Sequence, residues 1–165
     1  MSQRRKRTAL ADALRIIGFR DLSSSRLQER LLDRGHDPDE AAAAVARCVE
    51  LDYVNDHRFG LDRAGALLRR RPCGRLALHR DLQRQGLPRT MIGGVADAAY
   101  EDAGGERGVL AEAVSRWVEQ NGEPVDWPGI RRCSNHLGRR GFAGGDVQAA
   151  LSRWLDDLTT RGQFP

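Results

Sequence analysis

The sequence predicts an all-α protein made of three tandem three-helix repeats, each resembling a helix-turn-helix unit. Apolar residues recur at spacings of three and four positions along most of the 165 residues, which is typical of amphipathic helices. No stretch alternates apolar and polar residues with a period of two, so we expect no strands. A leucine followed four positions later by a glycine recurs at separations of 51 and 55 residues, which indicates an internal repeat.

The leucine–glycine pattern sets the register of the repeats. Its copies are Leu31 with Gly35, Leu82 with Gly86, and Leu137 with Gly141. Glycine readily adopts the left-handed conformation that closes many helices. We therefore expect each leucine to pack inside its repeat and each glycine to turn the chain towards the third helix.

The apolar spacing predicts each helix in turn. We expect helices around residues 10–17, 27–31 and 45–49, then 59–67, 78–82 and 91–95, and finally 110–117, 130–137 and 147–155. Asp37 before Pro38, Pro88 and Asp126 indicate helix starts, because short polar side chains and proline both suit the first turn.

These helices divide the chain into successive parts. The predicted parts are a flexible basic N-terminus (1–8), repeats at 9–54, 55–104 and 105–158, and a flexible tail (159–165). No apolar run approaches the roughly 18 residues of a membrane span, and no apolar region of a secretory signal follows the basic start. We expect a cytoplasmic monomer without a membrane segment.

The expected core is aliphatic, because apolar residues make up 40% of the chain and aromatic residues only 5%. Leu14 and Ile17 are expected on the buried face of the first helix. Cys48 and Cys133 fall on apolar stripes, whereas Cys73, between a proline and a glycine, is expected to be exposed. Three widely spaced cysteines fit a reducing compartment better than a disulfide framework.

Arginine is concentrated in the second and third repeats. Residues 63–92 hold eight arginines and one aspartate, and residues 127–145 hold four arginines and no acid, whereas residues 37–62 and 93–126 are acidic. A genome rich in G and C also raises arginine content, but like charges repel and their concentration favours a surface for phosphate or for an acidic partner. The arginines predicted to form this surface are Arg69, Arg70, Arg71, Arg75, Arg80, Arg84, Arg139 and Arg140.

The other reactive residue types predict no catalytic or metal site. The four histidines do not lie at metal-ligand spacing from another histidine or cysteine, and Cys73 has no base near it in the sequence. The serines at 23–25 are expected to cap a helix rather than to act as nucleophiles. No glycine-rich nucleotide motif occurs, so we expect no catalytic residue, no metal and no cofactor.

Four stretches together resemble the RecX regulatory protein family. They are ALRIIGFRDLSSSRLQERLLDRG (13–35), DYVNDHRFG (52–60), RRRPCGRLALHRDLQRQGL (69–87) and HLGRRGFAGGDVQAAL (136–151). Their order and spacing extend the resemblance over residues 9–158. Arg26 departs from the glutamate that would complete a capping box with Ser23, so Ser25 with Gln28 is an alternative cap for the second helix.

The resemblance implies an elongated, curved array that is not an enzyme and that modulates the RecA recombinase. Members of the family bind in the groove of the RecA–DNA filament and usually suppress its ATPase, strand-exchange and coprotease activities. The arginine-rich surface would then meet acidic filament surface and DNA phosphate, including weak direct contact with single- or double-stranded DNA. Such charge matching speeds encounter and sets register.

Two other classes of function stay open at this level. A stand-alone DNA-binding regulator of the helix-turn-helix type would also use three-helix units with a basic second helix. A helical enzyme would need a catalytic set that the residue pattern does not supply.

Overall fold

The computed structural model describes residues 7–160, apart from the side chains of residues 153 and 157. Over that range the chain forms nine α-helices and no strand, so the predicted all-α fold is confirmed. In chain order the helices are α1 (Ala9–Ile17), α2 (Ser24–Leu32), α3 (Pro38–Glu50), α4 (Asp56–Arg70), α5 (Arg75–Arg84), α6 (Arg89–Asp102), α7 (Gly105–Asn121), α8 (Trp127–Arg139) and α9 (Gly144–Thr160).

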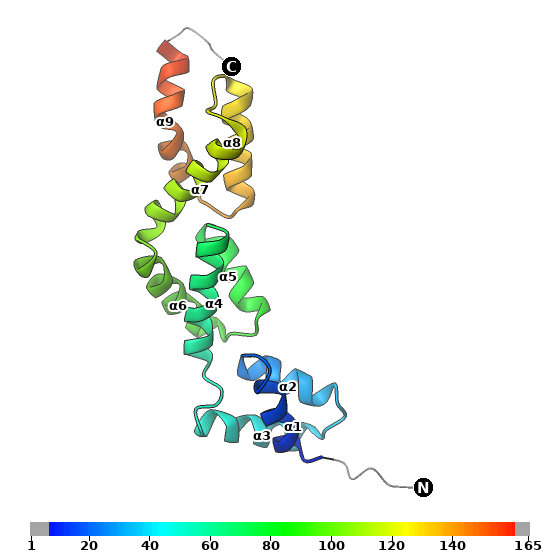
Figure 1. The fold of residues 1–165 in the computed structure, drawn as a ribbon. Coiled ribbons are helices and arrows are strands. Elements are labelled where there is room, and N and C mark those ends of the chain that lie inside the picture. The colour runs from blue at the N-terminus through cyan, green and yellow to red at the C-terminus, as the bar shows by residue number, and fades with distance from the viewer. Residues whose placement is uncertain (1–6, 161–165) are drawn as a thin grey trace.

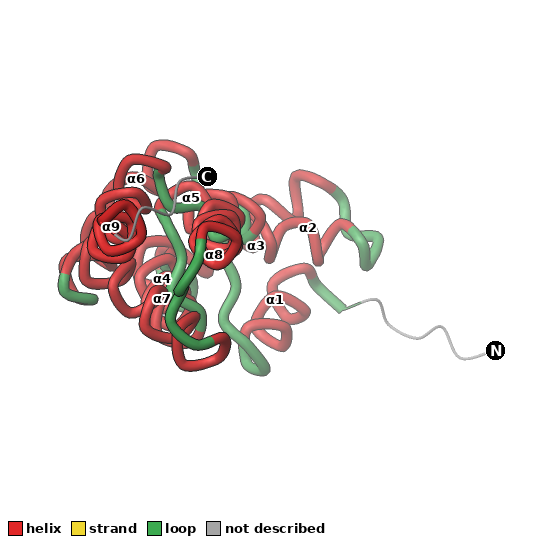
Figure 2. The backbone as a smooth tube through the Cα atoms, turned by 90° about the horizontal axis from the view of Figure 1, so that it is seen from above, coloured by secondary structure: helices red, strands yellow, loops and turns green. Residues whose placement is uncertain are grey.

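The helices follow one another in three groups of three along an elongated molecule (Figure 1). We call these groups unit 1 (α1–α3), unit 2 (α4–α6) and unit 3 (α7–α9). Figure 2, seen from above, shows unit 1 displaced to one side of the other two units. The array is therefore bent rather than straight.

The links between units contain the predicted repeat borders, which remain predictions. The border after residue 54 lies between α3 and α4, and the border after residue 104 lies between α6 and α7. At the C-terminal end α9 continues to Thr160, whose hydroxyl donates to the carbonyl of Asp156 at 2.8 Å. Residues 159 and 160 are thus helical rather than part of a tail. Residues 1–6 and 161–165, predicted to be flexible, lie outside the described residues.

The three repeated glycines end α2, α5 and α8 in one common way. Their φ angles are 79°, 84° and 83°, in the left-handed region that glycine adopts without strain. At each end the amide of the residue after the glycine donates to the carbonyl of the repeated leucine, at 3.3, 3.2 and 3.3 Å. The residues that donate are His36, Leu87 and Phe142, and all three are buried. The repeated pattern is therefore a Schellman-type helix ending with a buried anchor.

Neighbouring units are joined by the same pair of helix ends. The N-terminal end of the middle helix of one unit contacts the glycine turn of the middle helix of the next. Between units 1 and 2 the hydroxyl of Ser23 donates to the carbonyl of Gln85 at 2.5 Å. Between units 2 and 3 the amide of Gly74 donates to the carbonyl of Arg140 at 2.9 Å. Gln85 and Arg140 each come directly before a repeated glycine, so the two junctions correspond.

Ser23 is the N-cap of α2, which resolves the two caps that the sequence allowed. Its hydroxyl accepts a hydrogen bond from the amide of Arg26 at 3.2 Å while donating to Gln85. Ser23 is fully buried, whereas Ser25 is exposed. The alternative cap, Ser25 with Gln28, is wrong because the contact with unit 2 selects Ser23.

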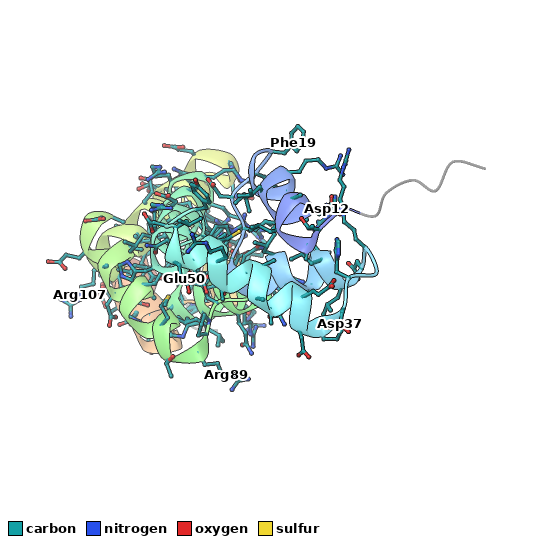
Figure 3. All side chains as sticks on the ribbon, turned by 90° about the horizontal axis from the view of Figure 1, so that it is seen from below. Asp12, Phe19, Asp37, Glu50, Arg89 and Arg107 are labelled. Atoms are coloured by element: carbon teal, nitrogen blue, oxygen red, sulfur yellow. The ribbon has the colours of Figure 1, made fainter. Side chains whose placement is uncertain are left out.

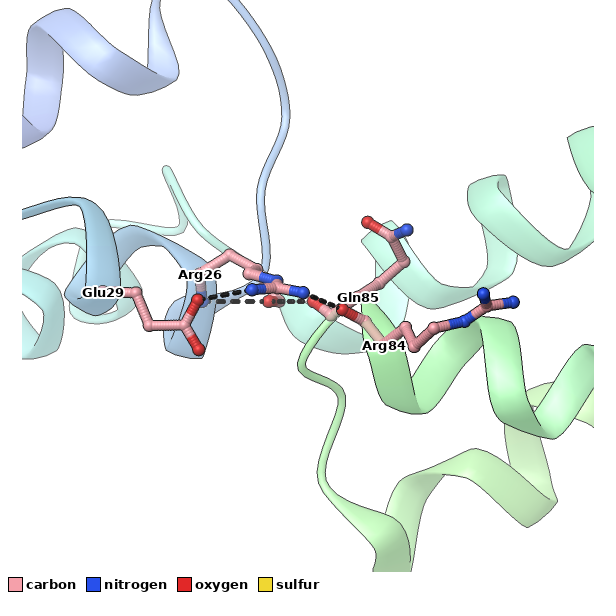
Figure 4. Close-up of polar contacts among 5 residues, drawn as sticks. Arg26, Glu29, Arg84 and Gln85 are labelled. Carbon is pink, nitrogen blue, oxygen red and sulfur yellow. Dashed lines mark hydrogen bonds and ion pairs between the residues drawn. The ribbon is translucent and has the colours of Figure 1, made fainter.

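The hydrophobic core has two separate parts. One cluster lies within unit 1 and includes Leu27 and Leu31, and the other runs continuously through units 2 and 3 and includes Leu82 and Leu137. The two clusters share no residue. Units 2 and 3 are therefore joined by a common apolar core, whereas the hydrogen bonds at the junction of units 1 and 2 are made by helix ends (Figure 4).

Two predictions about burial are wrong, since Leu14 was expected to be buried and Cys73 to be exposed. Leu14 is 41% exposed, and the buried face of α1 carries Ala9, Ala13 and Ile16 instead. The small alanines allow α1 to pack closely on α3, which turns the larger leucine outwards. Cys73 is buried, because the tight link between α4 and α5 is enclosed by the junction with unit 3.

Candidate functional site

The predicted arginine surface spans the C-terminal end of α4, the length of α5 and the C-terminal end of α8. Because α5 runs from one unit junction to the other, the set extends along the whole of unit 2. Six of the eight side chains belong to exposed residues that form no ion pair with any described residue. We call these six the exposed arginines; they are Arg69, Arg70, Arg71, Arg80, Arg84 and Arg139.

The single acid within residues 63–92 does not offset the exposed arginines. Asp81 pairs with Arg63 through two hydrogen bonds, from Nε at 2.7 Å and from Nη2 at 2.9 Å. This fork raises the pKa of Arg63, chiefly through the hydrogen bond to the carboxylate. Asp81 is therefore paired with Arg63, and its negative charge does not neutralise the exposed arginines.

Arg80 and Arg84 lie on the solvated side of α5, as predicted. The carbonyl of Arg84 accepts a hydrogen bond from Nη2 of Arg26 in unit 1, and Arg26 also pairs with Glu29 at 2.6 Å. Figure 4 shows the guanidinium of Arg84 pointing away from that junction. The carbonyl of Arg84 therefore takes part in the junction with unit 1, while its guanidinium remains available to a partner.

Arg75 has partners inside the molecule, unlike the exposed arginines. Its Nη1 lies 2.6 Å from Asp97 and its Nε lies 3.4 Å from Glu106, and its guanidinium lies 5.2 Å from the ring centroid of Tyr100. The hydrogen bond to Asp97 is the main cause of a raised pKa of Arg75. These contacts tie the start of α5 to α6 and α7, so the charge of Arg75 is largely neutralised within the fold.

Arg140 also makes hydrogen bonds within the fold. Its Nη2 donates to the carbonyl of Pro72 at 2.6 Å, beside the hydrogen bond that its own carbonyl accepts from Gly74. Burial, followed by the nearby charge of Arg71, lowers the pKa of Arg140. Its Nε is buried without a hydrogen-bond partner among the described residues.

Arg116 belongs to the same region but was not predicted. Its Nη1 and Nη2 donate to the carbonyls of Arg70 and Arg69, each at 3.1 Å, and its Nε donates to Glu112 at 2.7 Å. Arg116 thereby caps the C-terminal end of α4 from unit 3. It lies in the acidic segment 93–126 and 46 residues from Arg70, so neither charge density nor spacing singles it out.

Acidic side chains form a different face of the molecule. The N-cap of α3 is Asp37, followed by Asp39 and Glu40, and Glu50 ends the helix; all four are exposed. Figure 3 shows Asp37 and Glu50 at the two ends of this helix. The acidic residues of α3 thus lie on a different helix from the exposed arginines of α4, α5 and α8.

The described structure offers no activated nucleophile and no metal centre. All three cysteines are buried, and desolvation raises the pKa of Cys133 to about 11 and also raises the pKa of Cys48 and Cys73. Because the thiolate is the nucleophile, these thiols are unreactive at neutral pH. Among residues 7–160, no three metal-ligating side chains gather at one point, and no helix could cross a membrane.

Comparison with known proteins agrees with this architecture. The family model described as the first three-helix domain of RecX matches residues 9–48. A crystal structure of RecX from Lactobacillus salivarius superposes with a TM-score of 0.73 at 11% identity, covering 88% of this chain and 94% of that one. At that identity the likeness supports the fold.

The curated relatives support the family. A regulatory protein RecX from Xanthomonas axonopodis pv. citri is 33% identical over 156 residues, covering 93% of this chain and 91% of the relative. Another from Syntrophotalea carbinolica is 34% identical over 136 residues, covering 82% and 88%. Relatives this similar over this much of their length establish a non-enzymatic regulator, and the chain belongs to the RecX family.

Proposed function

We propose that this chain binds RecA, in the groove of the RecA–DNA filament, and inhibits the ATPase, strand-exchange and coprotease activities of RecA. Through this inhibition it tunes recombination, DNA repair and the SOS response. The protein acts as a cytoplasmic monomer and touches DNA weakly by itself. Membership of the RecX family supports the choice of partner.

The observation that carries the proposal is the row of exposed arginines along unit 2 and the end of α8. None of them has an acidic partner among the described residues, and the one acid of residues 63–92 pairs with Arg63. Arginine presents a planar fork that matches carboxylate and phosphate. Both groups are available on a filament of protein and DNA, so the same surface can contact either.

The length of the array supports binding along a filament rather than to a compact target. Stacked units leave long faces for a partner, as in other repeat proteins. The acidic face of α3 and the basic face of α5 lie in different units. Charge complementarity over such a distance sets the register of the complex and speeds its formation.

Charge reversal on α5 tests the proposal. The variant Arg80→Glu/Arg84→Glu should lose inhibition of the RecA ATPase, because two exposed contacts become repulsive, while its circular dichroism stays that of the wild type. The matched control is Arg30→Glu/Arg34→Glu, which makes the same charge change at exposed positions on α2 and in the turn after it, in unit 1. Full inhibition by the α5 variant would contradict the proposed surface.

A stand-alone DNA-binding regulator predicts a different outcome. Such a protein would protect one duplex sequence and leave RecA activity unchanged. Salt-sensitive binding to bare DNA does not separate the two functions, since both allow it.

A further inference from the structure

A small cavity lies at the junction of units 2 and 3, lined by the end of α4, the C-terminal half of α7 and the end of α8. Its volume is about 110 Å³, well above the ~10–15 Å³ that one water requires. The polar residues that line it are Arg70, Arg71, Arg116, Gln120, His136 and Arg140. They come from three separate segments of the chain, at 70–71, 116–120 and 136–140.

The lining of the cavity is strongly basic. Four of the lining residues are arginines and one is a histidine, and none of the described lining residues is acidic. Glu112 pairs with Arg116 but does not line the cavity. Like charges at this density repel one another, so the arrangement favours a bound anion.

The fold itself holds these charges in place. Arg116 is fixed by the carbonyls of Arg69 and Arg70, and Arg140 is fixed by the carbonyl of Pro72. Neither guanidinium can swing out into solvent without breaking a cap of α4 or a contact of the unit junction. The positive charge is therefore organised before any ligand arrives, which lowers the cost of binding one.

The arginines that line the cavity have donors without a partner among the described residues. The Nε of Arg140 is fully buried and has no acceptor among the described residues, although a buried donor is normally paired. The side chains of Arg70 and Arg71 donate no hydrogen bond to any described residue. An oxyanion in the cavity would supply acceptors for donors that approach from more than one helix.

The titration behaviour of the lining agrees with a positive potential. The pKa of His136 is lowered, first by burial and then by Arg140, Arg139 and Arg71. The charged groups around it are these arginines on α8 and at the end of α4, with Arg116 on α7. A bound anion would oppose their effect and favour the protonated ring.

We propose that this cavity is a binding site for a phosphate group. A tetrahedral phosphate offers acceptors in more directions than a planar carboxylate, which one arginine fork can satisfy. The phosphate can belong to a nucleic-acid backbone or be free inorganic phosphate. The site needs no RecA, so it would stand even if filament binding failed.

Nuclear magnetic resonance of the full chain tests the site without RecA. Inorganic phosphate is titrated at constant ionic strength against chloride while the ring signals of His136 are followed, assigned with His136→Gln. The expected result is a saturable shift, with the titration of His136 moved to higher pH. Shifts that follow ionic strength alone, or equal shifts with acetate, would overturn the proposal.

Two exposed arginines, one that lines the cavity and one outside it, provide a matched pair for the same titration. Arg71→Gln removes a lining charge and should weaken phosphate binding by about tenfold, the effect of losing one charge-assisted contact. Arg132→Gln removes an exposed arginine of α8 that does not line the cavity, so it should leave binding nearly unchanged. Equal losses in both variants would show a diffuse potential and would overturn the site.

A competition arm distinguishes the two sources of phosphate. A single-stranded oligonucleotide without terminal phosphate is added in place of inorganic phosphate. If it shifts His136 and inorganic phosphate displaces it, the site takes a backbone phosphodiester. If only inorganic phosphate shifts His136, the ligand is free phosphate, and the cavity is still a phosphate site.

Discussion

Gly141 meets two structural requirements, a left-handed φ and close contact with unit 2. Its φ of 83° favours glycine, and a Cβ there would lie 2.6 Å from the amide nitrogen of Ala77 in unit 2. Gly35 has nearly the same φ, 79°, but a Cβ there would meet no atom within 4 Å. The repeated glycine thus closes a helix in both units and, at Gly141, also permits close contact between units.

The substitution Gly141→Ala should therefore destabilise the protein more than Gly35→Ala. The left-handed conformation costs an alanine about 1–2 kcal/mol in either variant. Overpacking against Ala77 adds roughly 1–3 kcal/mol in Gly141→Ala alone. Urea denaturation measures the stability of both variants. Equal losses of stability would mean that the junction accommodates the added methyl group without loss of stability.

The pair of Asp12 and His36 makes unit 1 sensitive to acid. The Nε2 of buried His36 lies 3.0 Å from the Asp12 carboxylate, and this hydrogen bond is the main cause of a lowered pKa of Asp12. Because the pKa of Asp12 is lower in the folded state, its ionised carboxylate stabilises the fold at every pH above the ordinary pKa of 3.8. That stabilisation is lost as the pH falls through the lowered pKa.

Replacement Asp12→Asn should accordingly reduce the free energy of unfolding by about 1 kcal/mol at pH 6, the usual size of a lost hydrogen bond. The difference from wild type should shrink as the pH falls below 3.8. Urea denaturation over a pH series tests this, with a change at the exposed C-cap of α2, Asp33→Asn, as control. A difference that does not depend on pH would assign the effect of Asp12 to packing.

At the scale of the element, α2 begins where a unit junction requires it. Ser23 is the N-cap of α2 and also contacts Gln85 of unit 2, whereas Ser25 is exposed in the first turn. Ser23→Ala should cost about 1–2 kcal/mol, since it removes both a cap and a buried hydrogen bond. Ser25→Ala should be nearly neutral. Comparable losses in the two variants, measured by thermal unfolding, would contradict the assignment of the cap.

Sequence reasoning succeeded where a local pattern determines the element. The leucine–glycine pattern predicts three helix ends, and all three glycines have the expected left-handed φ. It failed where tertiary packing decides between local alternatives. Leu14 turns outwards because alanines bring α1 close to α3, and Cys73 is buried by unit 3, which no local pattern reveals.

The same limit applies to the candidate site. Charge density identified the exposed arginines, because concentrated charge is visible along the chain. It did not separate them from Arg75 and Arg140, whose partners lie on other helices. Arg116 was not predicted, because its contacts with Arg70 and Arg69 join residues that are 46 and 47 positions apart in the chain.

At the scale of the whole molecule, the two junctions differ in kind. Units 2 and 3 share one hydrophobic cluster, whereas unit 1 has its own. Hydrogen bonds such as those from Ser24 to Asp56, at 2.7 and 2.6 Å, hold unit 1 against unit 2. A junction without a shared apolar core allows relative motion more readily than a continuous core does.

We expect unit 1 to open separately from units 2 and 3. Native-state hydrogen exchange should give one group of opening free energies for amides of α2 and α3 and a higher group for α5 and α8. Asp56→Ala, which removes the acceptor of both bonds from Ser24, should lower the first group only. A single opening free energy throughout would mean that the three units unfold as one.

The central claim is that the exposed arginines of α5 hold the protein on the RecA filament. Cosedimentation with RecA on single-stranded DNA, compared with the same DNA alone, measures this most directly. Wild type and Arg30→Glu/Arg34→Glu should pellet with the filament well above the level seen with DNA alone, and Arg80→Glu/Arg84→Glu should stay in the supernatant. Pelleting of the α5 variant at the wild-type level, or wild-type binding no stronger than to bare DNA, would contradict the claim.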